Sequence, residues 1–286
     1  MSLRGFSETG NAKAPMLVIE PPKGWSAPSF REIWQSRELL FYLTWRDLKV
    51  RYKQTALGVG WVIIPPIFNM LVISVIFGGL AKLPSEGVPY AIFSFAGLVP
   101  WGLFSRALTG AGNSLLSGAG LSAKVYFPRL TITFSSVLSS LVDSGITLVV
   151  LFVMLLWFGI SVTWSWMAVV FFSALALLTA LGVGVWLAAL SVQFRDVAQV
   201  SSLLLTIWMY LSPVVYSSTL LPGGKLWTLY WLNPMAIVVQ GYRWSVLGSP
   251  LPPLNLSIVS TAGVLLALVS GLYYFQRVER TFIDLV

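Results

Sequence analysis

The chain has 286 residues, of which 57% are hydrophobic and only 10% are charged. Soluble globular proteins carry about 25% charged residues, so this chain cannot cover a water-facing surface and must expose much of itself to lipid. It contains no Cys and no His, which excludes a disulfide framework, a thiolate metal site and histidine-based acid–base chemistry.

The placement of the charges favours a membrane protein over a nucleic-acid-binding one. The net charge is +8, but nine of the 18 Lys and Arg residues precede residue 54, and most others lie in short gaps between apolar stretches. Orientation of helices in a membrane explains these positions better than a nucleic-acid footprint does. We therefore expect no nucleic-acid partner.

Residues 1–28 are predicted to form a flexible cytoplasmic tail. They are polar and are interrupted by several Pro and Gly residues. They contain no apolar stretch of the length that a secretory signal peptide requires, so we expect no such peptide here.

Residues 29–56 are predicted to form an amphipathic helix at the membrane interface. Ser29 and Glu32 have the spacing of a capping box, in which each side chain satisfies a free backbone N–H group at the helix start. Aromatic and basic residues on adjacent stripes suit a membrane interface. One stripe holds Trp34, Phe41, Trp45, Leu48 and Tyr52, and its neighbour holds Arg46, Lys49 and Lys53.

The basic residues of this helix have two readings. Arg46, Lys49 and Lys53, with Arg51 and Tyr52 nearby, form a candidate site for an anionic lipid head group. Alternatively, the same Lys and Arg residues only anchor the helix on the cytoplasmic side. The residues alone leave both readings open.

Six apolar stretches follow, and each is a candidate transmembrane helix, because a span needs about 20 apolar residues. Pro65 and Pro66 are expected to kink or restart the first span, and Pro100 interrupts the second. The predicted fold class is therefore an all-α membrane protein with six transmembrane helices. They cover approximately residues 58–80, 90–104, 131–157, 165–190, 197–215 and 256–274.

The Lys and Arg residues of the connecting segments predict the orientation. With the N-terminus in the cytoplasm, 15 of the 18 Lys and Arg residues lie inside, and only Lys82, Lys225 and Arg243 lie outside. Cytoplasmic loops carry the excess of Lys and Arg. Both termini are therefore expected in the cytoplasm.

Residues 217–255 are too interrupted for a seventh span and too apolar for an open loop. They are rich in Trp and Tyr, but Pro222, Gly223, Gly224 and the Asn233-Pro234 pair break them. Irregular backbone at membrane depth is tolerated only where protein or water satisfies its polar groups. We expect short re-entrant helices that dip into the outer leaflet before the last span.

Asp143 is the one ionisable residue well inside a predicted span. A carboxylate at the bilayer centre costs about 2.5–3.5 kcal/mol on insertion scales, so we expect it to face the bundle interior. The hydroxyls of Ser140, Ser144 and Thr147 lie within helical reach as donors. Asp143 is either a polar point at a transport pathway or helix junction, or a packing carboxylate.

Two further patterns have both a structural and a functional reading. Ala176, Ala180, Gly184 and Ala188 recur every four residues and permit close helix packing, within the chain or between subunits. Most aromatic residues suit interface belts. Trp208, Tyr210 and Tyr216 near Pro213 are candidates for lining a pathway, because aromatic faces can stack on sugar rings.

The sequence holds no nucleotide-binding motif. A P-loop requires Gly, four residues, and then Gly-Lys followed by Ser or Thr. The nearest fragment, Gly224-Lys225, has Thr219 in place of the first Gly and Leu226 in place of the hydroxyl residue. If transport is driven by ATP, then ATP and Mg²⁺ are expected on another chain, and we expect no cofactor or metal in this one.

Several motifs in order resemble the permeases of ABC-2 type transporters that export polysaccharides, such as O-antigen, capsule and teichoic acid. The resemblance covers about residues 38–286. The motifs are Trp45–Thr55 (WRDLKVRYKQT), Phe95–Trp101 (FAGLVPW), Lys124–Arg129 (KVYFPR), Phe194–Val197 (FRDV), Leu211–Tyr216 (LSPVVY), Leu232–Met235 (LNPM) and Glu279–Phe282 (ERTF).

The resemblance implies a multi-pass protein of the bacterial inner membrane that works as a homodimer with a cytoplasmic ABC ATPase subunit. Residues 57–286 would form the ABC-2 transmembrane domain. The loop between spans two and three, about residues 111–128, would couple to the ATPase. Its candidate residues are Asn113, which could cap a helix, Leu115, Leu116, Leu121 and Lys124.

The resemblance also implies a substrate, polyprenyl-pyrophosphate-linked polysaccharide, whose pyrophosphate would enter near residues 46–53. The chain would be the permease subunit of an ATP-driven exporter and no enzyme itself. Two alternatives stay open: an exporter of drugs or small lipids with the same fold, and a polyprenyl-phosphate glycosyltransferase. The second usually needs paired carboxylates, and the sequence shows no such pair within the membrane.

Overall fold

The computed structural model describes residues 34–53, 55, 57–122, 127–194, 196–220 and 223–281. Over these ranges the secondary structure is entirely helical, which confirms the predicted all-α class. The predicted tail over residues 1–28 and the capping box of Ser29 and Glu32 lie outside them.

The helices follow one another with short connections. Those of the first half are α2 (Arg37–Lys53), α3 (Gly60–Ile73), the π-helix η1 (Ser74–Leu80), α4 (Tyr90–Ser122) and α5 (Leu130–Trp157). Those of the second half are η2 (Trp164–Met167), α6 (Ala168–Gln193), α7 (Val197–Tyr210), η3 (Ser218–Leu220), α8 (Lys225–Trp231), α9 (Pro234–Leu247) and α10 (Leu254–Thr281).

Five helical stretches are long and apolar enough to cross a membrane. They are Gly60–Leu80, Tyr90–Gly118, Leu130–Trp157, Trp164–Gln193 and Leu254–Val278. The fifth predicted span, residues 197–215, corresponds to α7, an apolar helix of 14 residues. At 1.5 Å per residue it extends about 21 Å, which is less than the roughly 30 Å of a bilayer core.

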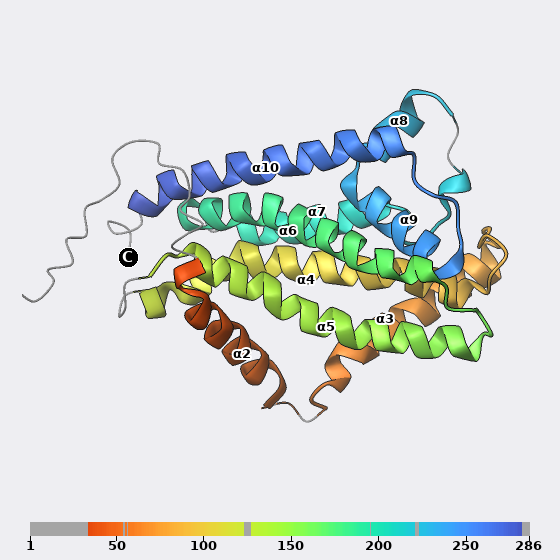
Figure 1. The fold of residues 1–286 in the computed structure, drawn as a ribbon, viewed down its shortest axis with the longest axis horizontal. Helices are drawn as coiled ribbons and strands as arrows, with labels where there is room; N and C mark the ends of the chain where they lie inside the picture. The colour runs from red at the N-terminus through yellow and green to blue at the C-terminus, as the bar shows by residue number, and fades with distance from the viewer. Residues whose placement is uncertain are drawn as a thin grey trace, which may run out of the picture.

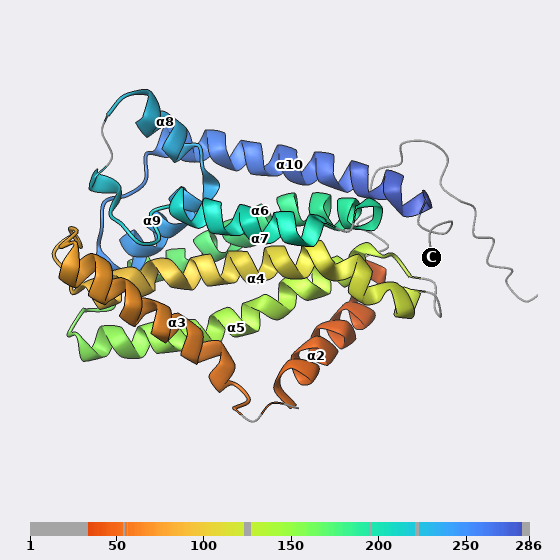
Figure 2. The same ribbon diagram turned by 180° about the vertical axis from the view of Figure 1, so that it is seen from behind.

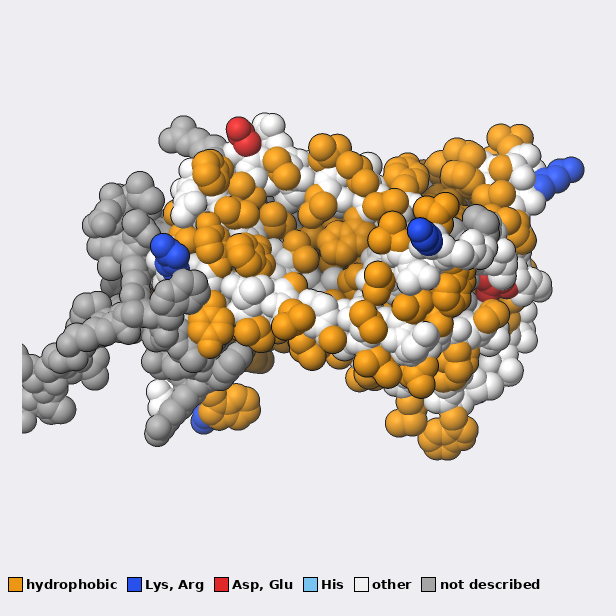
Figure 3. Space-filling view, turned by 90° about the horizontal axis from the view of Figure 1, so that it is seen from above, with side chains coloured by type: hydrophobic (Ala, Val, Ile, Leu, Met, Phe, Trp, Pro, Cys, Tyr) orange, Lys and Arg blue, Asp and Glu red, His pale blue; other side chains and the backbone are white. Residues whose placement is uncertain are grey.

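The long helices lie along one axis and form an elongated bundle (Figures 1 and 2). Helix α4 is central: it packs most extensively against α6 and α5, and most of its apolar stretch is buried. Helices α3 and α10 leave most of theirs exposed. Many hydrophobic side chains are exposed along the face shown in Figure 3, as expected for a surface in contact with lipid.

Helix α4 is longer than the sequence analysis expected. The second span was predicted to end near Phe104 and to give way to a loop, but α4 continues to Ser122. Its second half is rich in small residues that lie against neighbouring helices. A Cβ atom at Gly110 would meet Ser136 of α5, and one at Gly112 would meet Leu187 of α6. This close packing keeps the segment helical although it is less apolar.

The two prolines of the first span do not restart the helix. Helix α3 runs through Pro65 and Pro66 to Ile73, so the predicted restart is wrong. The two rings remove only the hydrogen bonds to the carbonyls one turn earlier. The irregularity follows later, where Ser74–Leu80 adopt π-helical geometry and the Ala81 amide donates to the Ile76 carbonyl at 2.8 Å.

The connection between α5 and α6 follows the prediction. Helix α5 ends at Trp157, and Gly159 adopts a left-handed conformation with φ of +69° that an L side chain would rarely tolerate. Trp157 and Trp164, on the two sides of this turn, are 87% and 88% exposed. Exposed Trp at both ends of a turn between spans is typical of a membrane interface.

The small residues of α6 pack within the chain. Ala176, Ala180 and Ala188 are fully buried. A Cβ atom at Gly184 would lie 2.6 Å from the Cβ atom of Ala111 in α4. The reading of this stripe as packing within the chain is therefore confirmed.

The interrupted segment before the last span consists of short helices, as predicted. Asn233 caps α9 by accepting a hydrogen bond from the Met235 amide at 3.0 Å, and Pro234 occupies the first turn. Gly248 ends the helix in a left-handed conformation. Asn233 also accepts from Trp208 of α7 at 2.8 Å and donates to the Leu211 carbonyl at 3.1 Å.

Arg243 of α9, which was counted among the Lys and Arg residues on the outer side, is fully buried within the chain. Its Nη2 and Nη1 atoms donate to the carbonyls of Val214 and Tyr216 at 2.9 and 3.1 Å. Its guanidinium carbon lies 3.6 Å from the centre of the Phe93 ring, a cation–π distance. Arg243 thus satisfies backbone carbonyls of the irregular segment that follows α7 and connects this segment to α4.

Candidate functional site

Helix α2 lies at an oblique angle to α5 (Figure 1), and the two are in contact. Leu43 and Leu48 form the buried side of α2. Trp34, Phe41 and Trp45 of the predicted aromatic stripe are exposed instead. Helix α2 therefore buries an aliphatic edge against the bundle and presents its large aromatic rings outward.

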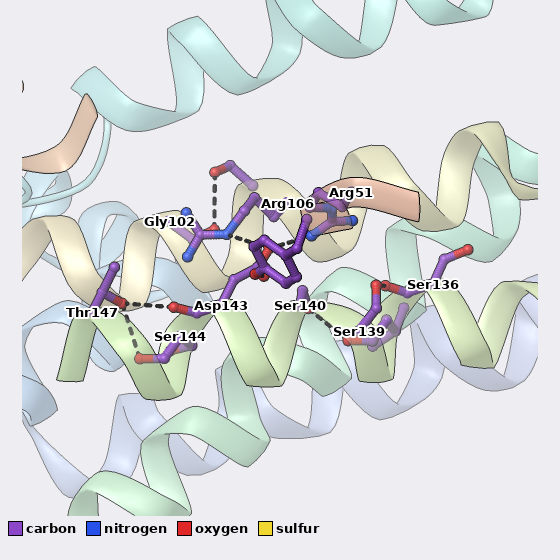
Figure 4. A network of polar contacts seen from close by, with 12 residues as sticks. Arg51, Gly102, Arg106, Ser136, Ser139, Ser140, Asp143, Ser144 and Thr147 are labelled. Atoms are coloured by element: carbon purple, nitrogen blue, oxygen red, sulfur yellow. Dashed lines mark hydrogen bonds and ion pairs between the residues drawn. The ribbon is translucent and has the colours of Figure 1, made fainter. Parts of the chain in front are cut away.

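Asp143, in the middle of α5, is the centre of a polar cluster. Its carboxylate is 1% exposed and forms an ion pair with Arg51. The same carboxylate accepts a hydrogen bond from the Tyr52 hydroxyl. Figure 4 shows Arg51 and Arg106 converging on Asp143 from different helices. The end of α2 is therefore joined to the centre of α5 through a buried charge.

The prediction that nearby hydroxyls of α5 donate to the Asp143 carboxylate is wrong. The Ser140 hydroxyl donates to the Val137 carbonyl at 2.6 Å, and that of Thr147 donates to the Ser144 carbonyl at 2.9 Å. The Ser144 hydroxyl is buried with no hydrogen-bond partner in the structure. Hydroxyls inside a helix readily bond to the preceding turn of their own backbone, which leaves the carboxylate to partners on other helices.

Arg106 is the third cation at this site, and sequence reasoning placed it in a cytoplasmic loop. It lies inside α4, and its Nε atom is 3.7 Å from a carboxylate oxygen of Asp143. Its Nε and Nη2 atoms are buried without a hydrogen-bond partner. Buried donor atoms that lack an acceptor are costly, so this guanidinium is suited to receive an anionic ligand. Nothing in the sequence around Arg106 indicated such a role, because its acidic partner, Asp143, lies on another helix.

A pocket of about 600 Å³ opens beside this cluster. Its wall combines the end of α2, the start of α3, the second half of α4 and the first half of α5. Arg46, Arg51 and Arg106 line it together with Asp47 and Asp143. Because Arg46 forms an ion pair with Asp47 at 2.9 Å, Arg51 and Arg106 share the single carboxylate of Asp143, and the wall keeps a net positive charge.

Tyr52 is held in its protonated form. Burial disfavours the phenolate, and the hydrogen bond to Asp143 disfavours it further, so the pKa of Tyr52 lies well above its ordinary value of 10.0. Its hydroxyl is therefore a permanent donor to the carboxylate at physiological pH.

The structure separates the five predicted head-group residues into two sets. Arg46, Arg51 and Tyr52 line the pocket. Lys49 and Lys53 are exposed on α2 and do not line it. These two lysines suit the anchoring role that was the alternative reading.

The three predicted pathway residues near Pro213 lie elsewhere, outside the wall of this pocket. The Trp208 ring packs edge-on against Phe104 of α4 at 5.0 Å and donates to Asn233. The Tyr216 hydroxyl donates to the Tyr210 carbonyl at 3.1 Å. Trp208 thus has a packing role, whereas the Tyr210 side chain is 60% exposed.

The predicted coupling residues also divide. Asn113 does not cap a helix, because it lies inside α4 and lines the pocket. Leu115 is buried in a cluster with Leu130, Val185 and Phe275, so it cannot dock on another protein. Leu116 is 52% exposed. The side chain of Leu121 and the whole of Lys124 lie outside the described part of the chain.

The site has the chemistry of anion binding. Arginine donates to phosphate oxygens with a planar, bidentate geometry. Within the described ranges, no group of three or more His, Cys, Asp and Glu side chains could hold a metal ion. The arginines that line the pocket can hold an anionic head group by charge-assisted hydrogen bonds.

Comparisons with known proteins agree with the sequence motifs. Residues 38–247 match the family described as ABC-2 type transporter. An O-antigen export system permease protein of Myxococcus xanthus is 31% identical over 255 residues, which cover 87% of this chain and 96% of the relative. One from Klebsiella pneumoniae is 28% identical, covering 87% and 95%. A polysialic acid transport protein of Escherichia coli is 21% identical, covering 71% and 78%.

Proposed function

This chain belongs to the ABC-2 type transporter family, and from that membership we infer that it is the permease subunit of an ATP-driven exporter of polysaccharide such as O-antigen. The observation that carries this inference is the coverage of the match. The chain aligns with nearly the whole length of O-antigen export permeases from two bacteria.

The substrate is a polysaccharide linked to a polyprenyl pyrophosphate. The positively charged pocket supports this choice, because Arg51 and Arg106 present guanidinium groups to a space large enough for a head group. Ligand pockets in proteins typically enclose about 300–1,000 Å³. The pyrophosphate would enter from the membrane between α2 and α3, which diverge from their connection as a V (Figure 2).

The partners are a cytoplasmic ABC ATPase and a second copy of this chain. An ABC-2 permease has an ABC ATPase partner, which supplies ATP and Mg²⁺ binding. The end of α4 is the candidate docking point, since it carries the exposed Leu116 and leads into the segment that was predicted to couple. The exposed faces of α3 and α7 are available to lipid or to the second copy.

The chain spans the bacterial inner membrane with both termini in the cytoplasm. The excess of Lys and Arg near the N-terminus supports this orientation. In that orientation α8 and α9 lie at the outer end, and the short helices dip into the outer leaflet. The backbone bonds made by Arg243 and Asn233 support this placement, because they satisfy polar groups that lipid could not.

Two other functions fit less well. An exporter of drugs or small lipids would share this fold, but the relatives reported above with the highest identity are O-antigen export permeases. An enzyme such as a polyprenyl-phosphate glycosyltransferase is disfavoured, because the relatives are transport permeases.

Deletion of the gene in its host tests the proposal. Polysaccharide should accumulate inside the cell and disappear from the surface, and expression of the chain with its ATPase should restore export. Immunoblotting of whole cells and spheroplast lysates measures both pools. Unchanged surface polysaccharide in the deletion strain would contradict the function, and altered drug sensitivity without a change in polysaccharide would favour a drug exporter.

A further inference from the structure

One face of α4 carries a polar stripe that extends from the arginine cluster along the pocket. Arg106, Thr109 and Asn113 follow at spacings of three and four residues, so their side chains share one side of the helix. All three line the pocket. Arg106 and Asn113 are separated by about 10 Å along the helix axis.

The two neutral members of this stripe have unused hydrogen-bonding capacity. Neither the Thr109 hydroxyl nor the Asn113 amide makes a hydrogen bond among the described residues, and Asn113 is only partly exposed. Ser105 and Ser117, which lie on the same wall, bond to carbonyls of their own helix instead. Thr109 and Asn113 are therefore the groups available to a ligand.

The opposite wall adds acceptors. Ser136 and Ser139 of α5 line the pocket and use their protons on carbonyls of α5, at 3.1 and 2.8 Å. A hydroxyl whose proton is already used still accepts through its oxygen lone pairs. Trp61, at the start of α3, adds a flat apolar face that is 56% exposed. The pocket thus combines donors, acceptors and an aromatic ring in one space.

This combination matches a sugar ring better than a lipid tail or a free phosphate. Sugar hydroxyls donate and accept at once, and the Asn amide supplies both functions in a fixed plane. The apolar face of a sugar stacks on an aromatic ring. A phosphate accepts hydrogen bonds and so needs only donor groups from the protein, and those are concentrated at the arginine end of the stripe.

We propose that Thr109 and Asn113 form a binding subsite for the first sugar of the glycan, while Arg51 and Arg106 hold the pyrophosphate to which that sugar is joined. This inference rests on the proposed function, because it assumes a glycan attached through pyrophosphate. It makes the permease selective for the sugar at the reducing end, in addition to its charge-based binding of the lipid head group.

Binding measurements on the full-length chain, purified with its ATPase and placed in nanodiscs, test this subsite. The probes are undecaprenyl pyrophosphate alone and the same lipid carrying one N-acetylglucosamine or one galactose. The wild-type complex should bind at least one sugar-bearing lipid about tenfold more tightly than the bare lipid, equivalent to about 1.4 kcal/mol. The double variant Thr109→Val/Asn113→Ala should lose that preference and keep its affinity for the bare lipid within about twofold.

Two further variants provide the controls. Thr109→Ser keeps the hydroxyl and should retain the preference. Thr206→Val makes the same change at an exposed position of α7 outside the pocket, and it should leave both affinities unchanged.

Three outcomes would contradict the proposed sugar subsite. They are a wild-type complex that binds both sugar-bearing lipids no more tightly than the bare lipid, a double variant that keeps the preference, and a double variant that loses affinity for all three lipids equally. A wild-type complex that binds none of the lipids would instead contradict the proposed function itself, and with it this inference.

Discussion

Arg51, in the last turn of α2, forms an ion pair with Asp143 in the middle of α5, which lies 92 residues further along the chain. The Asp143 carboxylate is almost fully buried, whereas the Arg51 side chain is 43% exposed. A buried carboxylate requires a partner, and here the partner comes from the helix that precedes the first span. The position of α2 therefore depends on the charge of one residue in α5.

Neutralising Asp143 should loosen α2. In Asp143→Asn the ion pair with Arg51 is lost, and the hydrogen bond from Tyr52 weakens because its acceptor is no longer charged. A spin label on a cysteine introduced by Lys49→Cys in this cysteine-free chain reports on α2. We expect a more mobile label in the variant, measured by electron paramagnetic resonance. Ser144→Ala removes a neighbouring buried hydroxyl that has no partner, so it should leave the label unchanged; equal mobility in Asp143→Asn would contradict the role of the pair.

Tyr52→Phe should destabilise the chain by about 1–2 kcal/mol, since it removes a hydrogen bond from a partly exposed side chain to the charged carboxylate of Asp143. The pKa of Tyr52 is raised above its ordinary value of 10.0. Because the pKa is raised on folding, the Tyr52 hydroxyl contributes its full share to the free energy of unfolding below pH 10. That contribution is lost only when the pH rises through the pKa of Tyr52 in the folded state. The difference in melting temperature between wild type and variant should therefore be constant from pH 6 to pH 9. A difference that declines within this range would show that the hydroxyl titrates earlier.

Glycine 184 should tolerate no larger side chain. In Gly184→Val the new Cβ atom would lie 2.6 Å from that of Ala111, and overpacking of this kind costs about 1–3 kcal/mol. Thermal unfolding in detergent should show a lower melting temperature. Gly145→Val is the matched control on α5, because a Cβ atom at Gly145 meets no atom within 4 Å. Equal effects of the two changes would contradict the close approach of α4 and α6.

Arg243→Met should destabilise the packing of α9 against α4 and the segment that follows α7. It leaves the carbonyls of Val214 and Tyr216 without their buried donor, at a cost of about 1–3 kcal/mol for each unsatisfied group. Arg243→Lys should restore stability only in part, because one ammonium group lacks the planar fork of the guanidinium. Melting temperatures measure both effects. Lys225→Met, at an exposed position, is the control; a melting temperature of Arg243→Met that matches it would refute the role of Arg243.

Leu115 and Leu116 should respond differently to the same change. Leu116→Asp alters an exposed side chain, so the permease should still insert, while copurification of the ATPase and export should fall if this end of α4 docks on the partner. Leu115→Asp places a charge in a buried cluster, and the protein should fail to fold. Membrane fractionation and affinity copurification distinguish the two results. Normal copurification and export with Leu116→Asp would exclude this segment from the docking surface.

The sequence predicts the long apolar helices well because their signal is local. Helices α5 and α6 begin and end within a few residues of the predicted limits, since charged residues are nearly absent between Arg129 and Arg195. The length of α4 was missed because its second half is rich in Gly and Ser and carries Arg106, a composition that resembles a loop. Only tertiary packing against α5 and α6 makes that half helical.

The site was only half predictable for a related reason. The sequence predicted four of the site residues, since basic residues gather on α2 and a carboxylate interrupts an apolar stretch. These residues are Arg46, Arg51, Tyr52 and Asp143. Nothing local to Asp143 indicates a partner 92 residues away. The hydroxyls nearest to it in sequence bond to the backbone instead, and the cations that contact it come from α2 and α4.

Helix α4 has 33 residues and is therefore about 50 Å long, well beyond the roughly 30 Å thickness of a hydrocarbon core. About 24 Å of uninterrupted helix separates Arg106 from Ser122, with no proline between them. A stiff rod has no joint in which movement is absorbed. If the Ser122 end is displaced, the guanidinium of Arg106 should move with it, so the proposed docking point and the proposed binding site would share one rigid element.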